Sequence, residues 1–229
     1  ASSDATLSAL ALSQGSLSPS FASGTLAYTA SVAHSVSSLI VTPTTNDANA
    51  TATVNGASPA TPVTLAVGSN TVTVQVTAQD GTTQSYTVAV TRAAASSDAT
   101  LSALALSSSS LSPSFASGTL AYTASVVHSV NSLIVTPTTN DANATATVNG
   151  ASAATPVTLA VGSNTVTVQV TAQDGTTTQS YTVTVTRAAA LTVALTGPSG
   201  TVTGPFTVTA TLSSPVVSFV ASDVTVVNG

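Results

Sequence analysis

Apolar and polar residues alternate along most of this chain in short runs, and the clearest run lies between residues 72 and 90. In 72–78 every second residue is Val or Ala, with Thr or Gln between, and after Asp80-Gly81 the alternation resumes at 86–90. Successive side chains of a strand point to opposite faces of the sheet. The pattern predicts a hairpin with one buried face, and Asp-Gly favours a type I′ turn in which both residues have positive φ.

Further segments of the first 67 residues have the length and composition of short strands. They are the run marked by Leu7, Leu10 and Leu12; 28–32; 39–42, closed by Pro43; 50–54, ended by the turn pair Asn55-Gly56; and 63–67, followed by Gly68. Residues 17–21 are expected to form a loop or short edge segment, because Pro19 cannot donate to a ladder. About seven short strands with regularly spaced turns predict an immunoglobulin-like β-sandwich.

An internal repeat covers most of the chain. Residues 1–83 recur 94 positions later, with five differences: Gln14/Ser108, Gly15/Ser109, Ala33/Val127, Ser37/Asn131 and Pro59/Ala153. Beyond Thr83 the offset becomes 95, so Thr178 is an extra residue beside the second hairpin turn, and Ala89/Thr184 is one further change. The alternation continues unchanged through 181–185. We therefore expect the loop to absorb the insertion without reversing the strand face.

The length of the repeat sets the expected domain organisation. A period of 94 residues is too long for a solenoid and suits a whole domain with its own core. We expect one sandwich at 1–93 and a second at 94–188. From Leu191 the pattern differs: strands are predicted at 191–196, 206–212, 216–220 and 224–227, with a turn at 197–200. These strands are too few to bury both faces of a sandwich, so 189–229 is expected to be a partial third β-sandwich.

Charged residues make up only 4% of the chain, which excludes several classes of partner. There are seven acidic residues, all Asp, and two basic residues, both Arg, for a net charge of −5. Two Arg side chains cannot neutralise many phosphates, so no nucleic acid partner is expected. A polybasic membrane contact is excluded on the same ground. No stretch approaches the roughly 20 apolar residues of a membrane span, so we predict no membrane insertion in this segment.

The chain contains no Cys, and Ser, Thr, Asn and Gln supply its polar surface. Domains of about 90 residues fold without disulfides. The composition is typical of bacterial surface proteins, and we expect an extracellular location, secreted or anchored to the cell surface. The first residues, Ala1-Ser2-Ser3-Asp4, include neither Met nor a signal-peptide pattern. We expect a processed chain or an interior fragment of a longer protein.

Few residues are candidates for a metal site. His34 and His128 occupy equivalent positions without Cys, Glu or a second His at ligand spacing, so a polar loop role is favoured. The segment Asn46-Asp47-Ala48-Asn49, repeated at 140–143, resembles a calcium loop but lacks its Gly and its distal acid. The predicted junction offers Asp98 alone. An Asx turn is the favoured interpretation, and no metal or cofactor is predicted.

No arrangement of residues predicts catalysis. Ser and Thr are abundant, but no base and orienting acid are gathered around one of them, and no Gly-x-Ser-x-Gly elbow occurs. The chain is therefore predicted not to be an enzyme. Two glycosylation sequons begin at Asn49 and Asn143; we interpret them as coincidental, and Ser/Thr glycosylation stays an open alternative.

The aromatic and basic residues are assigned structural roles. Phe21, Tyr28 and Tyr86, with their copies, each continue an apolar face and are expected in the core rather than on a stacking platform. Arg92 and Arg187 end the two copies. Each is expected to pair with an Asp or to cap the junction that follows.

An ordered set of residues recurs in both copies. In the first copy it consists of Leu7, Leu10, Leu17-Ser18-Pro19, Phe21, Tyr28, Val32, Val54-Asn55-Gly56, Gly68-Ser69-Asn70, Ala78-Gln79-Asp80-Gly81, Tyr86-Thr87-Val88 and Arg92. In this set each copy resembles the cadherin-like β-sandwich domain of bacterial surface proteins. The C-terminal part is similar to the first half of a bacterial Ig-like domain, through 202–208, Phe219 and 222–226. The resemblance implies very large, repetitive surface proteins in which such modules act as stalks or adhesive spacers.

The main hypothesis is a non-catalytic structural stalk or spacer of a bacterial surface protein or surface filament. Its expected partners are neighbouring domains of the same longer protein or identical subunits. One alternative is an adhesin or carbohydrate-binding module, which would bind a glycan or protein of a host or cell surface. The other is a filament subunit that assembles by strand complementation through its partial C-terminal domain.

Overall fold

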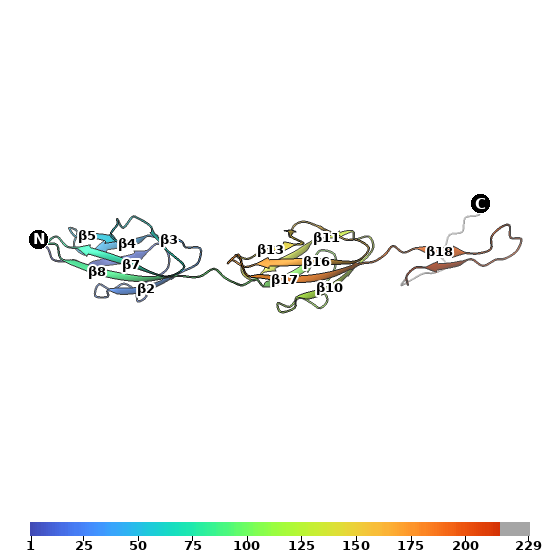
Figure 1. The fold of residues 1–229 in the computed structure, drawn as a ribbon, viewed down its shortest axis with the longest axis horizontal. Helices are drawn as coiled ribbons and strands as arrows, with labels where there is room; N and C mark the ends of the chain where they lie inside the picture. Colours follow the sequence, from blue (N-terminus) through green and yellow to red (C-terminus); the bar gives the residue numbers. More distant parts are fainter. Residues whose placement is uncertain (216–229) are drawn as a thin grey trace. The chain divides into compact units, whose positions relative to one another are not determined.

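The computed structural model describes residues 1–215, and within them every regular element is a β-strand. The chain divides into two compact units, the first at Ala1–Ser96 and the second beginning at Ser97. The strands predicted at 216–220 and 224–227 lie outside the described residues. The predicted all-β fold with tandem sandwiches is confirmed (Figure 1).

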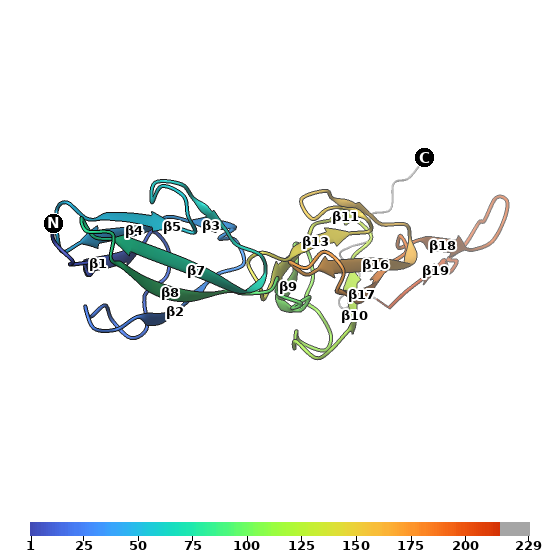
Figure 2. The same ribbon diagram turned by 60° about the vertical axis from the view of Figure 1, so that its left-hand side comes forward.

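The first unit contains eight strands. They are β1 (Leu7–Leu12), β2 (Ala27–Val32), β3 (Ser38–Leu39), β4 (Val41–Thr45), β5 (Thr51–Val54), β6 (Val63–Thr64), β7 (Gly68–Thr77) and β8 (Thr83–Arg92). One layer is a four-stranded sheet in the order β2-β8-β7-β5, in which β2 runs parallel to β8 and the other pairs are antiparallel. The other layer consists of the pairs β1-β4 and β3-β6. Figure 2 shows β7 and β8 as the long strands of this unit.

The second unit repeats this arrangement. Its strands are β9 (Leu101–Leu106), β10 (Ala121–Val126), β11 (Ser132–Leu133), β12 (Val135–Thr139), β13 (Thr145–Val148), β14 (Ala151–Ser152), β15 (Val157–Thr158), β16 (Gly162–Thr171) and β17 (Thr178–Arg187). The additional short strand β14 pairs with β13. The first unit has an isolated bridge, Val54 to Ala57, at the same place.

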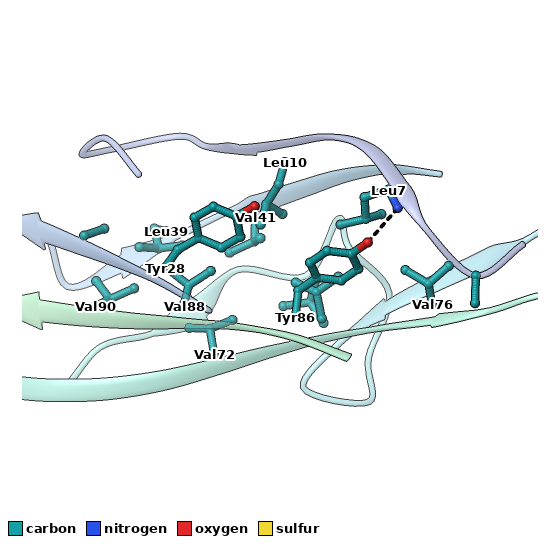
Figure 3. Close-up of a cluster of buried hydrophobic side chains, with 14 of the residues drawn as sticks. Leu7, Leu10, Tyr28, Leu39, Val41, Val72, Val76, Tyr86, Val88 and Val90 are labelled. Atoms are coloured by element: carbon teal, nitrogen blue, oxygen red, sulfur yellow. Dashed lines mark hydrogen bonds between the residues drawn. The ribbon is translucent and has the colours of Figure 1, made fainter. Parts of the chain in front are cut away.

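The predicted alternation of the β7–β8 hairpin is confirmed. The inward residues of both strands are fully buried or nearly so: Val72, Val74, Val76, Ala78, Tyr86, Val88 and Val90. They pack against Leu7, Leu10, Leu39 and Val41 of the opposite layer (Figure 3). The outward residues are mostly Thr and Ser. Thr tolerates an exposed position on a pleated sheet because its β-branched side chain favours strand geometry.

The turn of this hairpin differs from the prediction. Only Gly81 has a positive φ, at 94°, and Asp80 does not, so the turn is not type I′. The N–H of Gly81 donates to the carbonyl of Ala78 at 3.1 Å, and the N–H of Ala78 donates to the carbonyl of Thr82 at 2.8 Å. This is a longer connection in which a turn is followed by a glycine in the left-handed region. By contrast, Asn55 and Gly56 both have positive φ, 49° and 77°, as a type I′ turn requires.

The extra residue of the second copy is absorbed by this loop, as predicted. Thr178 itself opens β17 and pairs with Thr171, so the added length lies before it, at residues 176–177. The Ala172 N–H now reaches the carbonyl of Thr177 at 2.9 Å. Tyr181 and the valines that follow it on the inward face stay completely buried.

Several strand boundaries differ from the prediction. The run expected at 39–42 is divided between β3 and β4, and the strands expected at 191–196 and 206–212 begin only at Val193 and Thr209. Pro43 does not close a strand but lies inside β4, opposite Leu10. Because β4 has only one hydrogen-bonded neighbour, a residue without an N–H is tolerated on its open edge. The strand expected at 63–67 ends at Thr64. Beyond it the chain turns, because the Asn70 side chain binds both the N–H and the carbonyl of Ala66, each at 2.8 Å.

A bulge in β1 explains why Leu7 and Leu10 both face the core. Three residues apart, they would point to opposite faces of a regular strand. The register with β4 shifts between Leu7 and Ala9, which leaves Ser8 as the extra residue. The Ser8 hydroxyl lies 3.2 Å from the carbonyls of both Thr44 and Thr45. The same shift occurs at the equivalent place in the second unit.

One hydrogen bond joins the two layers inside the core. The Leu7 N–H donates to the Tyr86 hydroxyl oxygen at 3.0 Å, and both residues are 0% exposed (Figure 3). The Leu101 N–H and Tyr181 repeat this bond at 3.0 Å in the second unit. The first strand of each sandwich is thereby attached to its last strand. The prediction that Tyr28 and Tyr86 belong to the core is confirmed.

One difference between the copies has a clear local reason. Gly15 has a φ of 77°, and a Cβ there would lie 2.8 Å from the Ser31 carbonyl oxygen. The second copy has Ser109 at this position, outside the left-handed region, and its hydroxyl donates to the Ser125 carbonyl at 2.8 Å. The different backbone conformation at Ser109 thus avoids the clash that a side chain would cause at Gly15, and the serine hydroxyl forms a hydrogen bond instead.

Between the second sandwich and residue 215, the last one described, the chain forms an antiparallel hairpin of β18 (Val193–Thr196) and β19 (Thr209–Leu212). Its apolar side chains are exposed among the described residues, including Leu195 at 69% and Phe206 at 60%. A two-stranded ribbon alone cannot bury an apolar face.

We predict that Tyr86→Phe lowers the stability of the first sandwich alone. The change leaves the buried Leu7 N–H without an acceptor, which costs about 1–3 kcal/mol. For a domain of this size each kcal/mol corresponds to a shift in Tm of about 4–8 °C. In calorimetry of the whole chain, the nearly coincident transitions of the two sandwiches should separate, with the second sandwich as the internal control. A single unshifted transition would contradict the assigned role of this bond.

Candidate functional site

The chemistry-bearing side chains of each sandwich lie in three groups at its two ends. The first group surrounds Asp4, just before β1. Its Oδ1 accepts the N–H of Thr6 at 3.0 Å and the Thr6 hydroxyl at 2.6 Å, and its Oδ2 accepts the Asn46 amide at 2.7 Å. These bonds, led by that of the Thr6 hydroxyl, lower the pKa of Asp4 below its ordinary value. Asp98, Thr100 and Asn140 repeat the group, and the pKa of Asp98 is lowered in the same way.

The suspected calcium loop forms an Asx turn, as the sequence favoured. Asp47 Oδ1 accepts the N–H of Asn49 at 2.9 Å and its side-chain amide at 3.2 Å. A hydrogen bond from the Ser2 side chain is the main cause that lowers the pKa of Asp47, followed by the Asn49 N–H. The carboxylates here bind donors of their own unit. Within residues 1–215, no three His, Cys, Asp or Glu side chains are grouped as a metal site would need.

The second group lies at the turn of the long hairpin, where the copies differ. Asp80 accepts the N–H of Thr82 at 2.8 Å, which lowers the pKa of the Asp80 carboxyl. In the second copy Asp174 accepts three donors: the N–H of Thr176 at 2.9 Å, the N–H of Thr177 at 2.8 Å and the Thr177 hydroxyl at 2.6 Å. The Thr177 hydroxyl is the largest cause that lowers the pKa of Asp174 from 3.8 to about 2. The longer turn of the second copy thus brings three donors to its aspartate.

The third group closes the opposite end, which we call the exit end because the chain leaves the sandwich there after Arg92. Arg92 does not use an Asp for its described bonds; it donates to backbone carbonyls, which fits the capping alternative. His34 lies in an exposed loop, and its Nδ1 is 3.2 Å from the Ala93 carbonyl oxygen. Asn70 binds three carbonyls nearby. Asn70 was noted in the sequence only within the matching segment Gly68-Ser69-Asn70, and its capping role was not predicted, although it occupies the inward register two residues before Val72.

The aromatic side chains form no exposed platform among the described residues. Phe21 is partly buried and stacks on Tyr28 with ring centroids 6.1 Å apart. The Tyr28 hydroxyl oxygen lies within hydrogen-bonding distance of the carbonyl oxygens of Ala22 and Thr25, at 2.9 and 2.8 Å. Phe115 and Tyr122 repeat the stack at 6.0 Å. These rings hold the loop between β1 and β2 against the core.

The surface hollows offer hydroxyl groups without an activating base. The hollow beside β2 is lined by Ser, Thr, Pro, Ala and Tyr28, whose hydroxyl is already bonded. A second hollow beside β1 is lined by Thr6, Leu7, Ser8, Ser23, Gly24 and Asn46. Neither is lined by a His. In the second hollow the Thr6 hydroxyl donates to Asp4 Oδ1 at 2.6 Å, but Asp4 also accepts the Thr6 N–H and the Asn46 amide. The carboxylate therefore serves as an acceptor that holds this loop, and no imidazole base is at hand as in a Ser-His-Asp arrangement.

We predict that Thr177→Val raises the pKa of Asp174 from about 2 toward the ordinary 3.8, because its strongest donor is lost. A folded-state pKa below the unfolded value stabilises above pH 4, and this contribution disappears as the pH falls from about 4 to 2. The Asp174 side-chain carbon shift, followed by NMR titration, measures the pKa. The Asp80 resonance serves as the control and should not move. An unchanged Asp174 titration in Thr177→Val would contradict the assigned cause.

Comparisons with known proteins place both sandwiches in one family. The model of the cadherin-like beta sandwich domain matches residues 5–93 and 101–188. A protein of Evansella cellulosilytica named "Putative membrane protein" is 37% identical over 97 residues, which span 40% of this chain and only 15% of that protein. No helix within residues 1–215 is long and apolar enough to cross a membrane.

Solved structures of tandem β domains are similar at low identity. Domains 4–9 of the surface layer protein SbsC are 15% identical with a TM-score of 0.30, over 84% of this chain and 33% of that one. Domains EC3-6 of protocadherin gammaB7 are 14% identical with a TM-score of 0.28, over 74% of this chain and 48% of that one. The family assignment rests on the model matches instead. Since these cover both sandwiches and most of the sequence, the chain belongs to the cadherin-like beta sandwich domain family.

Proposed function

We propose that this chain is a non-catalytic spacer of an extracellular bacterial surface protein or surface filament. Domains of this family and fold are typically extracellular and non-catalytic. The sandwiches would hold other parts of a longer protein at a distance from the cell envelope. Neighbouring domains of the same protein, or identical subunits, are the proposed partners.

The observation that carries the proposal is the path of the chain through each unit. The Ser2 carbonyl accepts the N–H of Asp80 at 3.1 Å, so the chain begins beside the turn between β7 and β8. It leaves after Arg92, at the other end of the ten-residue strand β8. Ten residues of strand span about 33 Å. Each sandwich therefore carries the chain from one of its ends to the other, so that a chain under tension would gain about that length with each added copy.

The surface chemistry supports the same role. The outward positions of β7 and β8 are occupied mainly by Thr and Ser, with Gln75 and Ala89 and without charge. Such a face gives solubility without a strong field to attract a charged ligand. The aromatic side chains of the two sandwiches, which a carbohydrate-binding surface there would use, are packed against the cores. The two sandwiches therefore offer no aromatic platform that favours the adhesin alternative.

The strand-complementation alternative draws on one observation, the exposed apolar side chains of β18 and of the segment between β18 and β19, such as Leu195 and Phe206. The spacer role is independent of it, because it depends only on the two complete sandwiches. A chain could act as a spacer in either a single surface protein or an assembled filament.

We predict that the function depends on the number of repeats and not on which copy is present. Deleting residues 1–94 from the parent surface protein should bring an N-terminal tag closer to the cell by about 33 Å, as measured by super-resolution or gold-label microscopy. Replacing the first copy with a second copy of 95–189 is the matched control and should leave the distance unchanged. Loss of binding to a glycan or cell that an unrelated sandwich of equal length does not restore would favour an adhesin instead.

A further inference from the structure

The only two cationic Lys or Arg side chains of the chain occupy equivalent places, each at the last residue of a sandwich. In the first unit the Arg92 Nε and Nη2 donate to the His34 carbonyl at 2.9 and 2.7 Å, and Nη1 donates to the Leu65 carbonyl at 2.9 Å. Arg187 makes the same three bonds to His128 and Leu159 at 2.9, 2.7 and 2.9 Å. The two arginine side chains are thus held by the same three hydrogen bonds, one set in each unit.

The register of β8 places this guanidinium at the end of the core. Tyr86, Val88 and Val90 face inward, and Arg92 is the next inward position along the strand. Its two acceptors belong to the loop after β2 and to the segment between β6 and β7. The buried Leu65 is therefore held by its carbonyl. One side chain of the last strand fastens two other segments across the exit end.

Hydrogen bonds of the backbone beside Arg92 attach the same end of β8 to the rest of the sandwich. The Ala93 N–H donates to the Val32 carbonyl at 3.0 Å, and the Ala93 carbonyl lies 3.2 Å from His34 Nδ1. In the ladders Arg92 pairs with Val32 of β2 and with Gly68 of β7. The residue through which the chain leaves the sandwich is consequently attached to the sheet on both sides and to two loops.

Tension along the chain acts on each sandwich at two places, the residues before its first strand and the residues at the end of its last strand. Because the chain begins at the hairpin-turn end and leaves at the exit end, a pull on both ends runs along β8. That load shears β8 against β7 over ten paired positions and against β2 over six. Shear loads many bonds together, whereas peeling of the last residues would break the ladder one pair at a time. The contacts of residue 92 are the ones that oppose peeling.

We propose that Arg92 and Arg187 are mechanical clamps that prevent the last strand of each sandwich from peeling when the chain is under tension. The inference rests on the proposed spacer function and adds a residue-level device to it. A guanidinium suits this task because charged hydrogen bonds are stronger than neutral ones and its fork reaches two acceptors at once. Lys offers a compact point charge without that fork.

The test is single-molecule force spectroscopy on the full chain. The chain has no Cys, so cysteines introduced at residues 1 and 190 give unique handles that load both sandwiches end to end. At constant force, Arg92→Gln should raise the unfolding rate of one sandwich about tenfold or more, as expected for loss of a charge-assisted hydrogen bond. The second sandwich is the internal control. Thr91→Ala, on the outward side of the same strand end, is the matched control and should leave both rates unchanged.

A second pulling geometry separates a clamp from a residue that only adds stability. Handles at residues 1 and 58 load the first sandwich without passing force through residue 92. The proposal expects Arg92→Gln to have a clearly smaller effect there than in the end-to-end geometry. Equal acceleration in both geometries, or none in either, would overturn the clamp.

Two further cases are covered: the Arg92→Gln variant does not fold, or the spacer function itself is wrong. If Arg92→Gln prevents folding, Arg92→Lys carries the test, with an expected unfolding rate clearly above that of the unmodified chain; an unchanged rate would overturn the clamp. Failure of the spacer function has a different signature: the unmodified sandwiches would then yield end to end as readily as through residues 1 and 58. Resistance of the unmodified chain with an unaffected Arg92→Gln would reject the clamp alone.

Discussion

Each sandwich depends on the hydrogen bond between a tyrosine hydroxyl and a leucine amide inside its core. Leu7 lies on the first strand and Tyr86 on the last, in opposite layers, and both are completely buried. A buried N–H without an acceptor is costly, so the bond fixes how the layers must align. The bulge at Ser8 brings Leu7 and Leu10 to the same face. The first and last strands therefore belong to one cooperative unit, although no ladder joins them.

This attachment connects the fold to the proposed function. A spacer must transmit force between its two ends, and here those ends are the beginning of β1 and the end of β8. The polar side chains of the unit gather at the same two places: Asp4 and Asp47 where the chain begins, Asn70 and Arg92 where it leaves. Between them the core is made of Val, Leu, Ala and Tyr, and the outer sheet face is largely hydroxyl-bearing. The hydrogen-bonding polar side chains named here thus lie at the two ends where the chain enters and leaves the sandwich.

Much of this fold could be predicted from the sequence, because strand alternation depends only on local geometry. The inward faces of β7 and β8 and the tolerance of the hairpin loop for an extra residue were predicted correctly. The error at residues 65–67 is local, because the Asn70 side chain binds Ala66 four residues away, whereas the errors at Pro43 and Asp80 share a cause that no local pattern shows. Whether a proline interrupts a strand depends on which neighbours the strand has, and a turn type depends on the register of the strands it joins. The acceptors of Arg92 lie on loops distant in sequence, so no local pattern identifies them.

The most direct test of the account is native-state hydrogen exchange of the Leu7 and Leu101 amides. If the tyrosine bonds attach the first strand of each sandwich to its last, both amides should exchange only through global unfolding of their unit. Their protection would then match that of Val74 and Val88 in the long hairpin of the first unit, and of Val168 and Val183 in the second. Exchange of Leu7 and Leu101 at the rate of a fraying strand end, while the hairpin amides stay protected, would contradict it.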